Sequence, residues 1–529
     1  LGLMFKIIGL IYRTVRYLTL QQILYRVLYA LKLNGAFRYK FSLDSKHPLI
    51  SFPFVHQNLS YHKELNEFSF LNKKVCFSDK IDWNFSENGK LWTYNLCYLD
   101  FINQKNLETT KVTEILNGFY TGYDTIISGK DPYPTSLRIM NLIKLMSNGK
   151  HYHDDNLSKI LFSDLRRLLK SVEYHLLGNH VLENGFALYF AVHAYPTNHK
   201  LRNKAIKILR KELEEQILND GAHFERSLMY HQIILSRLLE CISLSKSNPH
   251  EWNSSFLDFL ISKAEKMLGW LNSITERGQV FIRFNDSIEG ISPTTFEILR
   301  FSKYLELNSI STTLTDSGFR KFKVNDLLMI TNTGRIISDY QPGHSHANTF
   351  SFLLFDKTKP IIVDPGISTY ENNRLRLQQR STTNHNTINI NGINNNEVWS
   401  SFRVGRRAKV KIIQEHTDYL KAVHNGYSHI NLLHSRSWKV EEKSIRILDE
   451  LIGKSAIGEF NIHLHPEVKV QKISSYKVLL NDNLIIEVNS NAPLEISSYD
   501  YAVGFNRLKK SLKIHGQFQN KTETLITIV

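Results

Sequence analysis

The spacing of apolar residues changes abruptly near Asp316, and this change limits the folds that are open to the chain. From about residue 91 to 307, apolar residues recur every three or four positions, which predicts amphipathic helices. The clearest segments are ILFSDLRRLLKSVEYHLL, NKAIKILRKELEEQIL, MYHQIILSRLLECISL and SFLDFLISKAEKMLGWLNSI. From about Asp316 the period falls to two, as in LLMITNTGRIISDY, RAKVKIIQEH and KVLLNDNLIIEVN, which predicts strands.

We therefore predict an α+β multidomain protein. A chain of 529 residues is too long for one ordinary core. Long helices joined by short polar turns are typical of stacked antiparallel helix pairs, arranged as a solenoid or a toroid. Asn-Gly and Asn-Asp turn signals between the strands favour an antiparallel β-sandwich. The predicted divisions are an N-terminal extension over 1–90, a helical domain over 91–315 and a β-domain over 316–529. Since no low-complexity linker separates the halves, we expect a cleft for a long polymer at their seam.

The charge of the chain indicates an anionic partner. There are 66 Lys and Arg residues against 50 Asp and Glu residues, a formal net charge of +16. Nucleic acid, an anionic polysaccharide and an acidic membrane surface would all be attracted. The sequence contains no recognisable nucleic-acid-binding module, so we expect no nucleic-acid partner.

The first thirty or so residues predict a basic amphipathic helix. Ile23, Leu24, Val27, Leu28 and Leu31 recur at helical spacing, and several arginines lie in the same stretch. The helix could dock on the body of the protein or lie on a membrane surface. The stretch resembles neither a membrane span nor a cleavable export signal. We expect a cytoplasmic or inner-membrane-peripheral protein, with a periplasmic location left open.

The segment GNHVLENGF places three polar residues at the start of a predicted helix. Asn179 and His180 precede the helical pattern, and Glu183 lies one turn beyond His180 on the same face. The inverted zinc-protease signature H-x-x-E-H fails because Asn184 stands at its second histidine. The residues alone favour Asn179 as a helix cap and His180 as a partly buried polar side chain.

The segment DGAHFERSLMYHQ gathers polar residues at a turn that enters a helix. Arg226 could hold a substrate carboxylate through two parallel hydrogen bonds. Tyr230 could exchange a proton, and His231 follows it directly. We include Arg226 and His231 among the expected substrate contacts. A solvated loop is the alternative interpretation of the same spacing.

Two histidines and an aspartate lie next to β structure in the second half. His346, Asp364 and His385 would be a reasonable nitrogen and oxygen ligand set for zinc. On a strand, His344 and His346 would share a face, so one could bind a metal while the other serves catalysis. Ordinary hydrogen-bonding histidines at strand ends are the alternative.

Several segments, in order along the chain from about residue 91 to 407, closely resemble the heparinase II/III-like polysaccharide lyases. They are LWTYNLCYLDF, DPYPTSLRIMNLIK, GNHVLENGFAL, DGAHFERSLMYHQ, GHSHANTFSFLLF, VDPGISTY and RSTTNHNTININGINNNEVWSSFRVGRRA. The resemblance implies an incomplete (α/α) toroid followed by an antiparallel β-sandwich. It also implies cleavage of uronic-acid polysaccharides by β-elimination, with a zinc ion in the β-domain.

The same resemblance implies roles for particular residues. Asn179 would neutralise the uronate carboxylate, which must be neutralised before the neighbouring C5 proton can leave. Tyr230 and His344 would carry out the proton transfers, in an order that the sequence does not determine. His180 and Glu183 would line the same subsite.

The resemblance also implies a structural role for the metal. His346, Asp364 and His385 match the metal positions of the family, where the ion fixes the loop that presents the adjacent histidine. Tyr370, after VDPG, matches a tyrosine near the cleft.

The leading expectation is a lyase acting on a uronate-containing glycan. The N-terminal stretch resembles those of heparinase-like proteins associated with bacterial surface-polysaccharide synthesis, and this resemblance implies a role in that metabolism rather than in nutrient scavenging. A uronate C5-epimerase and a non-catalytic glycan-binding or assembly protein are the alternatives.

Overall fold

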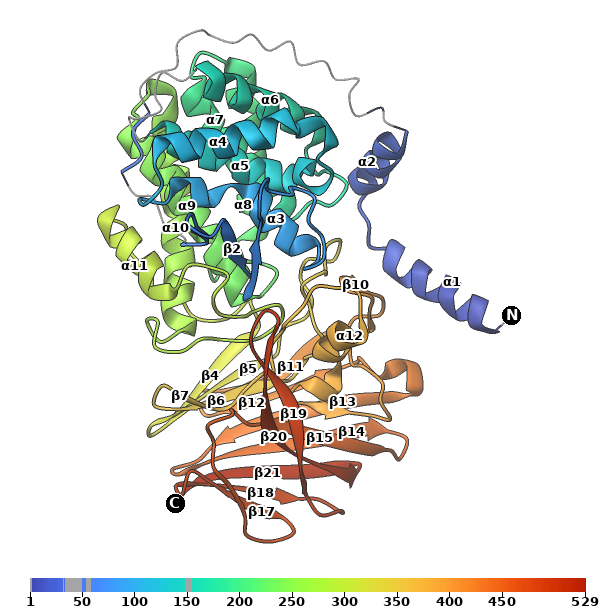
Figure 1. Ribbon diagram of the computed structural model, residues 1–529. Helices are drawn as coiled ribbons and strands as arrows, with labels where there is room; N and C mark the ends of the chain where they lie inside the picture. Colours follow the sequence, from blue (N-terminus) through green and yellow to red (C-terminus); the bar gives the residue numbers. More distant parts are fainter. Residues whose placement is uncertain (1, 32, 34–49, 54–58, 148–154) are drawn as a thin grey trace.

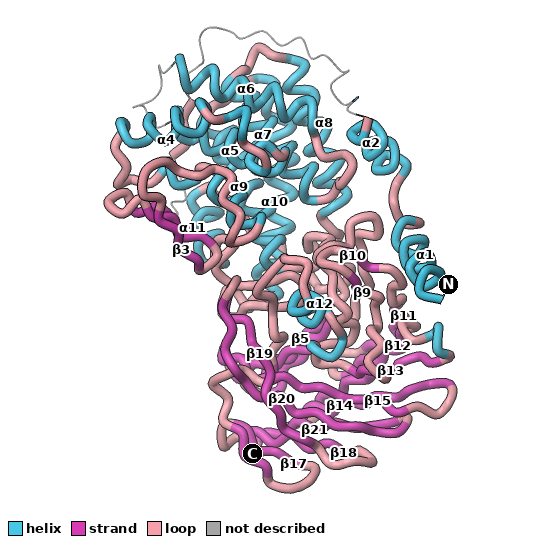
Figure 2. The backbone as a smooth tube through the Cα atoms, turned by 45° about the vertical axis from the view of Figure 1, so that its right-hand side comes forward, coloured by secondary structure: helices cyan, strands magenta, loops and turns pink. Residues whose placement is uncertain are grey.

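The chain folds into a helical domain that sits on a β-domain, as Figure 1 shows for the computed structural model. The structure describes residues 2–31, 33, 50–53, 59–147 and 155–529. Figure 2 shows the same two layers from a second direction, with loops and the short helix α12 (Arg374–Arg380) at the seam. The predicted fold class, a helical toroid followed by an antiparallel β-sandwich, is confirmed.

The helical domain is built from antiparallel neighbours. Amphipathic patterns in the sequence coincide with α6, α8, α9 and α10, although α6 ends at Ser171, before the predicted pattern does. The helices are α3 Lys90–Tyr98, α4 Thr109–Thr121, α5 Pro132–Met146, α6 Asp155–Ser171, α7 Asn179–Ala194, α8 His199–Gln216, α9 Leu228–Ser247, α10 Ser254–Ile274 and α11 Thr295–Tyr304. Both α5 and α7 are buried along almost their whole length, so they form the centre of this domain.

The N-terminal region contributes a small sheet and two helices. The sheet consists of β1 Tyr61–His62, β2 Glu67–Phe70 and β3 Lys73–Cys76. Instead of one helix, the first thirty residues form α1 Gly2–Val15 and α2 Leu20–Ala30, which begins at a capping box of Thr19 with Gln22. Within the described ranges, none of the helices combines the length and apolar character needed to cross a bilayer.

The β-domain contains three main antiparallel sheets. One has the order β4-β5-β6-β7, with β4 Phe319–Val324, β5 Leu327–Asn332, β6 Phe352–Asp356 and β7 Lys359–Ile362. The second has the order β11-β12-β13-β14-β21-β18-β17-β16. Its strands are β11 Val410–Glu415, β12 Tyr419–His424, β13 Leu432–Val440, β14 Ser444–Gly453, β16 Val470–Lys472, β17 Lys477–Leu480, β18 Leu484–Asn489 and β21 Lys521–Ile528.

The third sheet has the order β19-β20-β15-β8. Its strands are β8 Ile388–Asn389, β15 Ile457–His463, β19 Glu495–Gly504 and β20 Arg507–Gln519, and a separate pair joins β9 Val398–Trp399 to β10 Arg403–Val404. The turn between β19 and β20 reaches up to the helical domain in Figure 1. There Asn72 donates to the Phe505 carbonyl and Asn506 donates to the Leu71 carbonyl.

Strand β5 joins the cores of the two domains. Its side chains alternate between two faces, and all six residues are buried. Leu328 and Ile330 pack into the core of the helical domain, while Leu327 and Met329 pack into the core of the sandwich. A strand buried on both faces has no polar side to present, which explains the continuous apolar run in the sequence.

Candidate functional site at the domain seam

Tyr230 and His344 are in contact at the seam between the domains. Tyr230 lies in the first turn of α9, which Ser227 caps, and His344 lies in the loop 341–351 before β6. Their ring centroids are 4.0 Å apart. The Tyr370 hydroxyl, from the β-domain, lies 3.2 Å from the Tyr230 hydroxyl. The two domains thus bring together three residues that are far apart in the sequence.

A small apolar cluster holds this group in place. Tyr230 packs with Met229 and Ile288 from the helical side and with Ile367, Ala502 and Phe505 from the β-domain. Tyr230 and His344 are only 9% and 8% exposed, so both residues are almost fully shielded from solvent. Packing from both domains therefore fixes the Tyr230 and His344 side chains.

Asp286, in the loop between α10 and α11, orients His344. Its carboxylate oxygen Oδ2 accepts a hydrogen bond from His344 Nδ1 at 2.8 Å, and Oδ1 accepts one from His346 Nε2 at 2.8 Å. Arg376, from α12, donates to both oxygens at 2.5 and 2.7 Å. Burial by itself would raise the pKa of Asp286, but Arg376 and the two imidazoles hold it well below its usual range. An ionised Asp286 keeps the proton of His344 on Nδ1, so Nε2 carries the free lone pair.

The sequence analysis missed Asp286 and Arg376. Asp286 follows the apolar run VFIRFN, and Arg376 lies in the segment RLRLQQR, so neither stands in a recognisable motif. An acidic residue shortly after the largely apolar segment VFIRF is the one signal that could have marked Asp286. His344 and His346 lie in the loop before β6 and not on a strand. They nevertheless point to the same carboxylate.

The protonation states of the pair follow from burial. Burial raises the pKa of the Tyr230 phenol well above its usual value, and Tyr370 and Asp286 raise it further. Burial lowers the pKa of His344, although Asp286 opposes this shift. At neutral pH the pair is therefore a protonated phenol beside a neutral imidazole, which is one proton donor and one proton acceptor.

Asn179 and His180 begin α7 on the helical side of the same region. Asn179 is the first residue of the helix rather than its cap, which corrects the interpretation from the residues alone. Gly178 is the cap, with φ of +61°, and a Cβ atom there would lie 3.1 Å from Gln341 Cγ. His180 Nδ1 lies 3.0 Å from Glu173, which raises the His180 pKa above its usual value against the opposing effect of burial. A cationic His180 suits a site for an anionic sugar.

Glu225 lies behind Asn179. The Asn179 side-chain amide donates to Glu225 Oε2 at 3.5 Å, and both residues are buried. Burial raises the pKa of Glu225 well above its usual value, and Asp286 raises it further. A neutral Glu225 adds no negative charge beside Asn179, so it does not repel a substrate carboxylate there.

This shift predicts a pH effect on stability. The pKa of Glu225 is higher in the folded state than in the unfolded chain, so the fold loses stability as pH rises above the unfolded value. Glu225→Gln keeps the shape without the charge. Its unfolding free energy should therefore fall less than that of the wild type between about pH 5 and about pH 8. Denaturant titrations at the two pH values measure the difference, and equal slopes for both proteins would contradict the prediction.

Two other predicted site residues, Glu183 and His231, lie away from the Tyr230–His344 pair. Glu183 is buried in an ion-pair network, where it accepts a hydrogen bond from Arg237 at 2.8 Å. His231 is buried against the Met267 carbonyl at 3.1 Å. These side chains stabilise the helical domain beneath the site and do not line it.

Arg226 is engaged in the contact between the domains. Its guanidinium donates to the carbonyls of Ser317 and Arg335, at 2.6 and 2.9 Å, and to the side chain of Asn332. Burial lowers the Arg226 pKa to about 9. The expectation that Arg226 holds a substrate carboxylate is therefore corrected: it holds the start of the β-domain on α9.

The three predicted metal residues lie together behind His344. His385 Nδ1 lies 2.8 Å from Asp364 Oδ2, and the rings of His346 and His385 are 5.3 Å apart. Among the described residues, no three His, Cys, Asp or Glu side chains are grouped as a ready metal site. His346 Nδ1 and His385 Nε2 are nevertheless buried and have no hydrogen-bond partner in the described part of the chain. Two buried imidazole lone pairs fit a metal ion.

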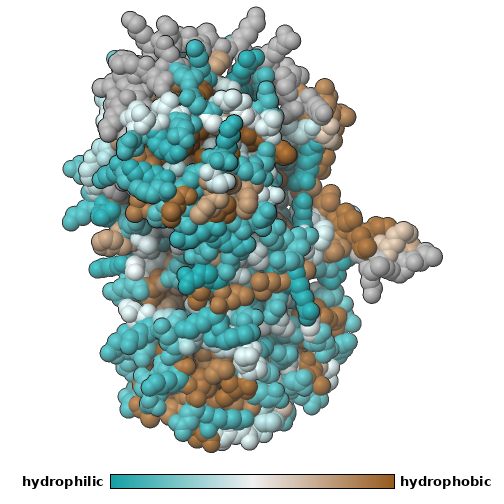
Figure 3. Space-filling model, viewed as in Figure 1, coloured by the Kyte–Doolittle hydropathy of each residue, from teal (hydrophilic) through white to brown (hydrophobic). Residues whose placement is uncertain are grey.

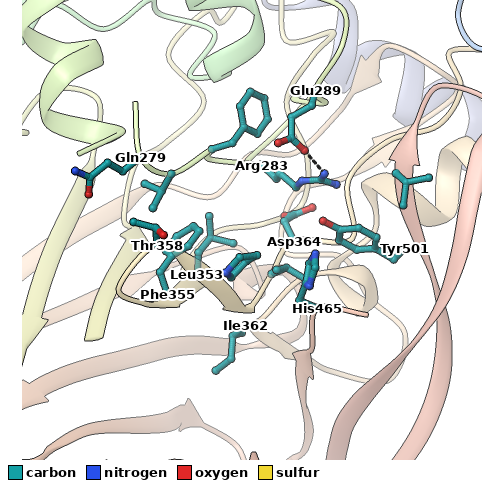
Figure 4. Close-up of a pocket in the computed structure, with 15 residues that line it drawn as sticks. Gln279, Arg283, Glu289, Leu353, Phe355, Thr358, Ile362, Asp364, His465 and Tyr501 are labelled. Atoms are coloured by element: carbon teal, nitrogen blue, oxygen red, sulfur yellow. Dashed lines mark hydrogen bonds and ion pairs between the residues drawn. The ribbon is translucent and has the colours of Figure 1, made fainter. Parts of the chain in front are cut away.

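A cavity of about 370 Å³ opens at the seam on the other side of Asp364. Figure 4 shows Arg283 paired with Glu289 above Asp364, Tyr501 and His465. The lining comes from the loop after α10, from β6 and β7, and from the region of β19. Neither Tyr230 nor His344 lines this cavity, so it is distinct from the contact that they form.

Comparison with known proteins agrees with this architecture. The fold is that of the toroid-and-sandwich proteins. A crystal structure of Heparinase III superposes with a TM-score of 0.69 and 17% identity, covering 95% of this chain and 91% of the other. The chondroitin AC lyase of Streptomyces coelicolor, solved with chondroitin sulphate, superposes with a TM-score of 0.50 and 8% identity. This superposition covers 83% of this chain and 74% of the lyase chain.

The sequence places the chain in a family. Models named "Heparinase II/III N-terminus" and "Heparinase II/III-like, C-terminal" match residues 136–307 and 308–528, which together are about three quarters of the chain. The chain belongs to the heparinase II/III-like family. It is 24% identical over 327 residues to the heparin-sulfate lyase of Pedobacter heparinus, covering 55% of this chain and 47% of the relative. For the heparin-sulfate lyase of Bacteroides thetaiotaomicron the identity is 24% over 373 residues, or 61% and 51% of the two chains. The chain thus spans about half the length of the curated relatives that it matches.

Proposed function

We propose that the protein is a polysaccharide lyase that cleaves a uronic-acid-containing anionic glycan by β-elimination. The observation that carries the proposal is the contact at 4.0 Å between the rings of Tyr230 and His344, supplied by different domains. The hydrogen bond from His344 Nδ1 to Asp286 leaves Nε2 as a proton acceptor. A proton acceptor beside a proton donor is what elimination requires at neighbouring carbons.

In the proposed reaction His344 Nε2 removes the C5 proton of the uronate. The C4–O4 bond breaks, a C4–C5 double bond forms, and the Tyr230 hydroxyl gives its proton to the departing O4. Asn179 donates amide hydrogen bonds to the uronate carboxylate as negative charge develops on it. Tyr370 lies within 3.2 Å of the Tyr230 hydroxyl and orients that proton. Solvent then returns the proton of Tyr230 and takes the one held by His344.

The proposed substrate is a glycosaminoglycan or a similar uronate polymer. The relatives named above are heparin-sulfate lyases, and the net charge of +16 favours an anionic polymer. We propose that the glycan belongs to bacterial surface-polysaccharide metabolism and that the protein works in the cytoplasm or at the inner membrane. A cationic His180 beside Asn179 supports an acidic sugar at this place.

Incubation with separate uronate polymers tests the activity. The panel is heparin, heparan sulfate, chondroitin sulfate, hyaluronan and alginate, with ultraviolet absorbance of the new C4–C5 double bond as the readout. We expect absorbance to rise with at least one polymer. A folded protein that produces no unsaturated product from any of them would contradict the proposal. Solvent deuterium entering C5 without chain cleavage would instead indicate an epimerase.

We also propose a structural zinc ion held by His346, His385 and the Asp364 carboxylate. The two buried ring nitrogens without a partner among the described residues support it. Bound zinc would fix the loop that carries His344. Each ligand would donate a lone pair in its neutral or anionic state, as zinc requires.

Metal binding predicts a stability effect that does not depend on activity. Added zinc should raise the Tm of the metal-free wild type, because an ion that binds only the folded state stabilises it. His385→Ala should abolish that rise and the metal content measured by mass spectrometry. His416→Ala, at an exposed strand end, is the control: this variant should keep both the rise in Tm with zinc and the bound metal. A wild type that binds no zinc, or a His385→Ala variant that still binds one equivalent, would contradict the proposal.

A further inference from the structure

Helix α1 turns its apolar side away from the protein. Its exposed residues recur at helical spacing and are Met4, Phe5, Ile7, Ile8, Ile11, Tyr12 and Val15. The opposite side carries the contacts with the body. Arg13 pairs with Glu397 at 2.7 Å, and Trp399 donates to the Thr14 hydroxyl at 3.1 Å. A surface helix that packs on a core normally has the reverse arrangement.

Helix α2 likewise exposes apolar residues and turns polar residues toward the body of the protein. Its exposed stripe is Leu20, Ile23, Leu24, Val27 and Leu31, and Leu20 is 86% exposed. The inner side is polar: Gln22 donates to the carbonyls of Leu176 and Tyr340, and Tyr29 donates to the Val172 carbonyl. In Figure 3 the apolar colour covers much of the coloured part of α1, which Figure 1 shows projecting on the right, below α2. Large contiguous apolar surface on a protein marks an interaction site.

Arginines border the apolar stripes. Arg16 is exposed directly after α1, and Arg403 is exposed in the neighbouring strand β10, whereas Arg406 beside it is paired with Glu397 at 2.8 Å. Burial lowers the pKa of Arg26, and the charge of Arg403 lowers it further. Arg407 lies over the Tyr17 ring at 3.7 Å, so this loop packs directly on the segment that joins the two helices. Apolar residues bordered by cations match the chemistry of a membrane interface with anionic headgroups.

We infer that α1 and α2 together dock the protein on a lipid bilayer surface that contains anionic lipid. Each helix is held along one side by polar contacts with the body and so lies flat, with its apolar stripe entering the interface. The bordering arginines pair with the headgroup phosphates. This inference does not depend on the proposed lyase activity, since it uses no residue of the seam site.

Vesicle flotation tests the inference on the full chain. The probes are phosphatidylcholine vesicles with and without about one third phosphatidylglycerol. We expect the bound fraction to be about tenfold higher with the anionic lipid and to fall at high salt. Ile11→Glu with Leu24→Glu places charge in both stripes and should lower binding at least about tenfold. Phe296→Glu with Ile413→Glu, which changes exposed apolar residues elsewhere, should bind as the wild type does.

Circular dichroism and Tm serve as the check that both double variants are folded. The inference is overturned if the wild type binds no vesicle, or binds neutral and anionic vesicles equally. It is also overturned if Ile11→Glu with Leu24→Glu leaves binding unchanged. A wild type that is a dimer by sedimentation velocity, converts to a monomer in that variant and binds no vesicle would show that a second copy covers the stripes instead.

Discussion

Tyr230→Phe is expected to lower kcat on a cleaved polymer by about 10²–10⁴-fold, because the departing O4 loses its proton donor. KM should change little, since the ring keeps its contact with His344 and with the apolar cluster around Met229. Initial rates of double-bond formation over a range of substrate concentrations measure both quantities.

Tyr499→Phe is the matched control for this prediction. Tyr499, in β19, donates its hydroxyl proton to the Leu464 carbonyl at 2.7 Å, and it is buried like Tyr230. Loss of this hydrogen bond should reduce the free energy of unfolding slightly and leave kcat near that of the wild type. A Tyr230→Phe variant that keeps more than about one tenth of wild-type kcat would rule out proton transfer by Tyr230.

Asp286→Ala is expected to lower the free energy of unfolding by roughly 3–5 kcal/mol, because it leaves the buried cation of Arg376 without its partner. Asp286 accepts four hydrogen bonds from His344, His346 and Arg376. The variant should also lower kcat of the protein that remains folded, since nothing then holds the His344 proton on Nδ1. Denaturant unfolding and steady-state kinetics measure the two effects.

Asp164→Ala separates these effects. Asp164, in α6, is likewise buried and accepts two hydrogen bonds from Arg138 and one from each of two tyrosines, all within the helical domain. It should cost similar stability and leave kcat of the folded protein unchanged. Asp286→Asn, which keeps an acceptor for His344, should restore part of the kcat. If Asp286→Ala lowered stability alone, as is expected of Asp164→Ala, the positioning role would be rejected.

The repeat of apolar residues predicted most of the fold. The three-to-four spacing before residue 307 matches α8, α9 and α10 within a few residues, and the two-residue spacing matches β11, β17 and β18. At the turn between β17 and β18, Asn481 and Asp482 both have positive φ, as the Asn-Asp signal predicts. These features are local, because the side chains of one segment and the turn that follows determine them.

The sequence alone also identified chemically suitable residues, but it could not identify their partners. Tyr230 and His344 stand 114 positions apart, and only the packing of α9 against the loop before β6 brings their rings together. Arg226 and Tyr230 occur in one motif but have different partners, since Arg226 lies in the turn before α9 and contacts Ser317, whereas Tyr230 lies in the first turn of the helix and packs in the apolar cluster.

The sequence by itself determined the two kinds of domain, their order and the residue types that could move protons, because each follows from short-range spacing and side-chain chemistry. Only the tertiary structure decided that Asp286 and Arg376 orient His344 and that Glu183 lies in the core. It also decided that α1 and α2 turn their apolar sides outward, which their amphipathic pattern left open. A hydrogen-bond partner or a buried face depends on segments that meet only when the chain is folded, and no single stretch of sequence contains that contact.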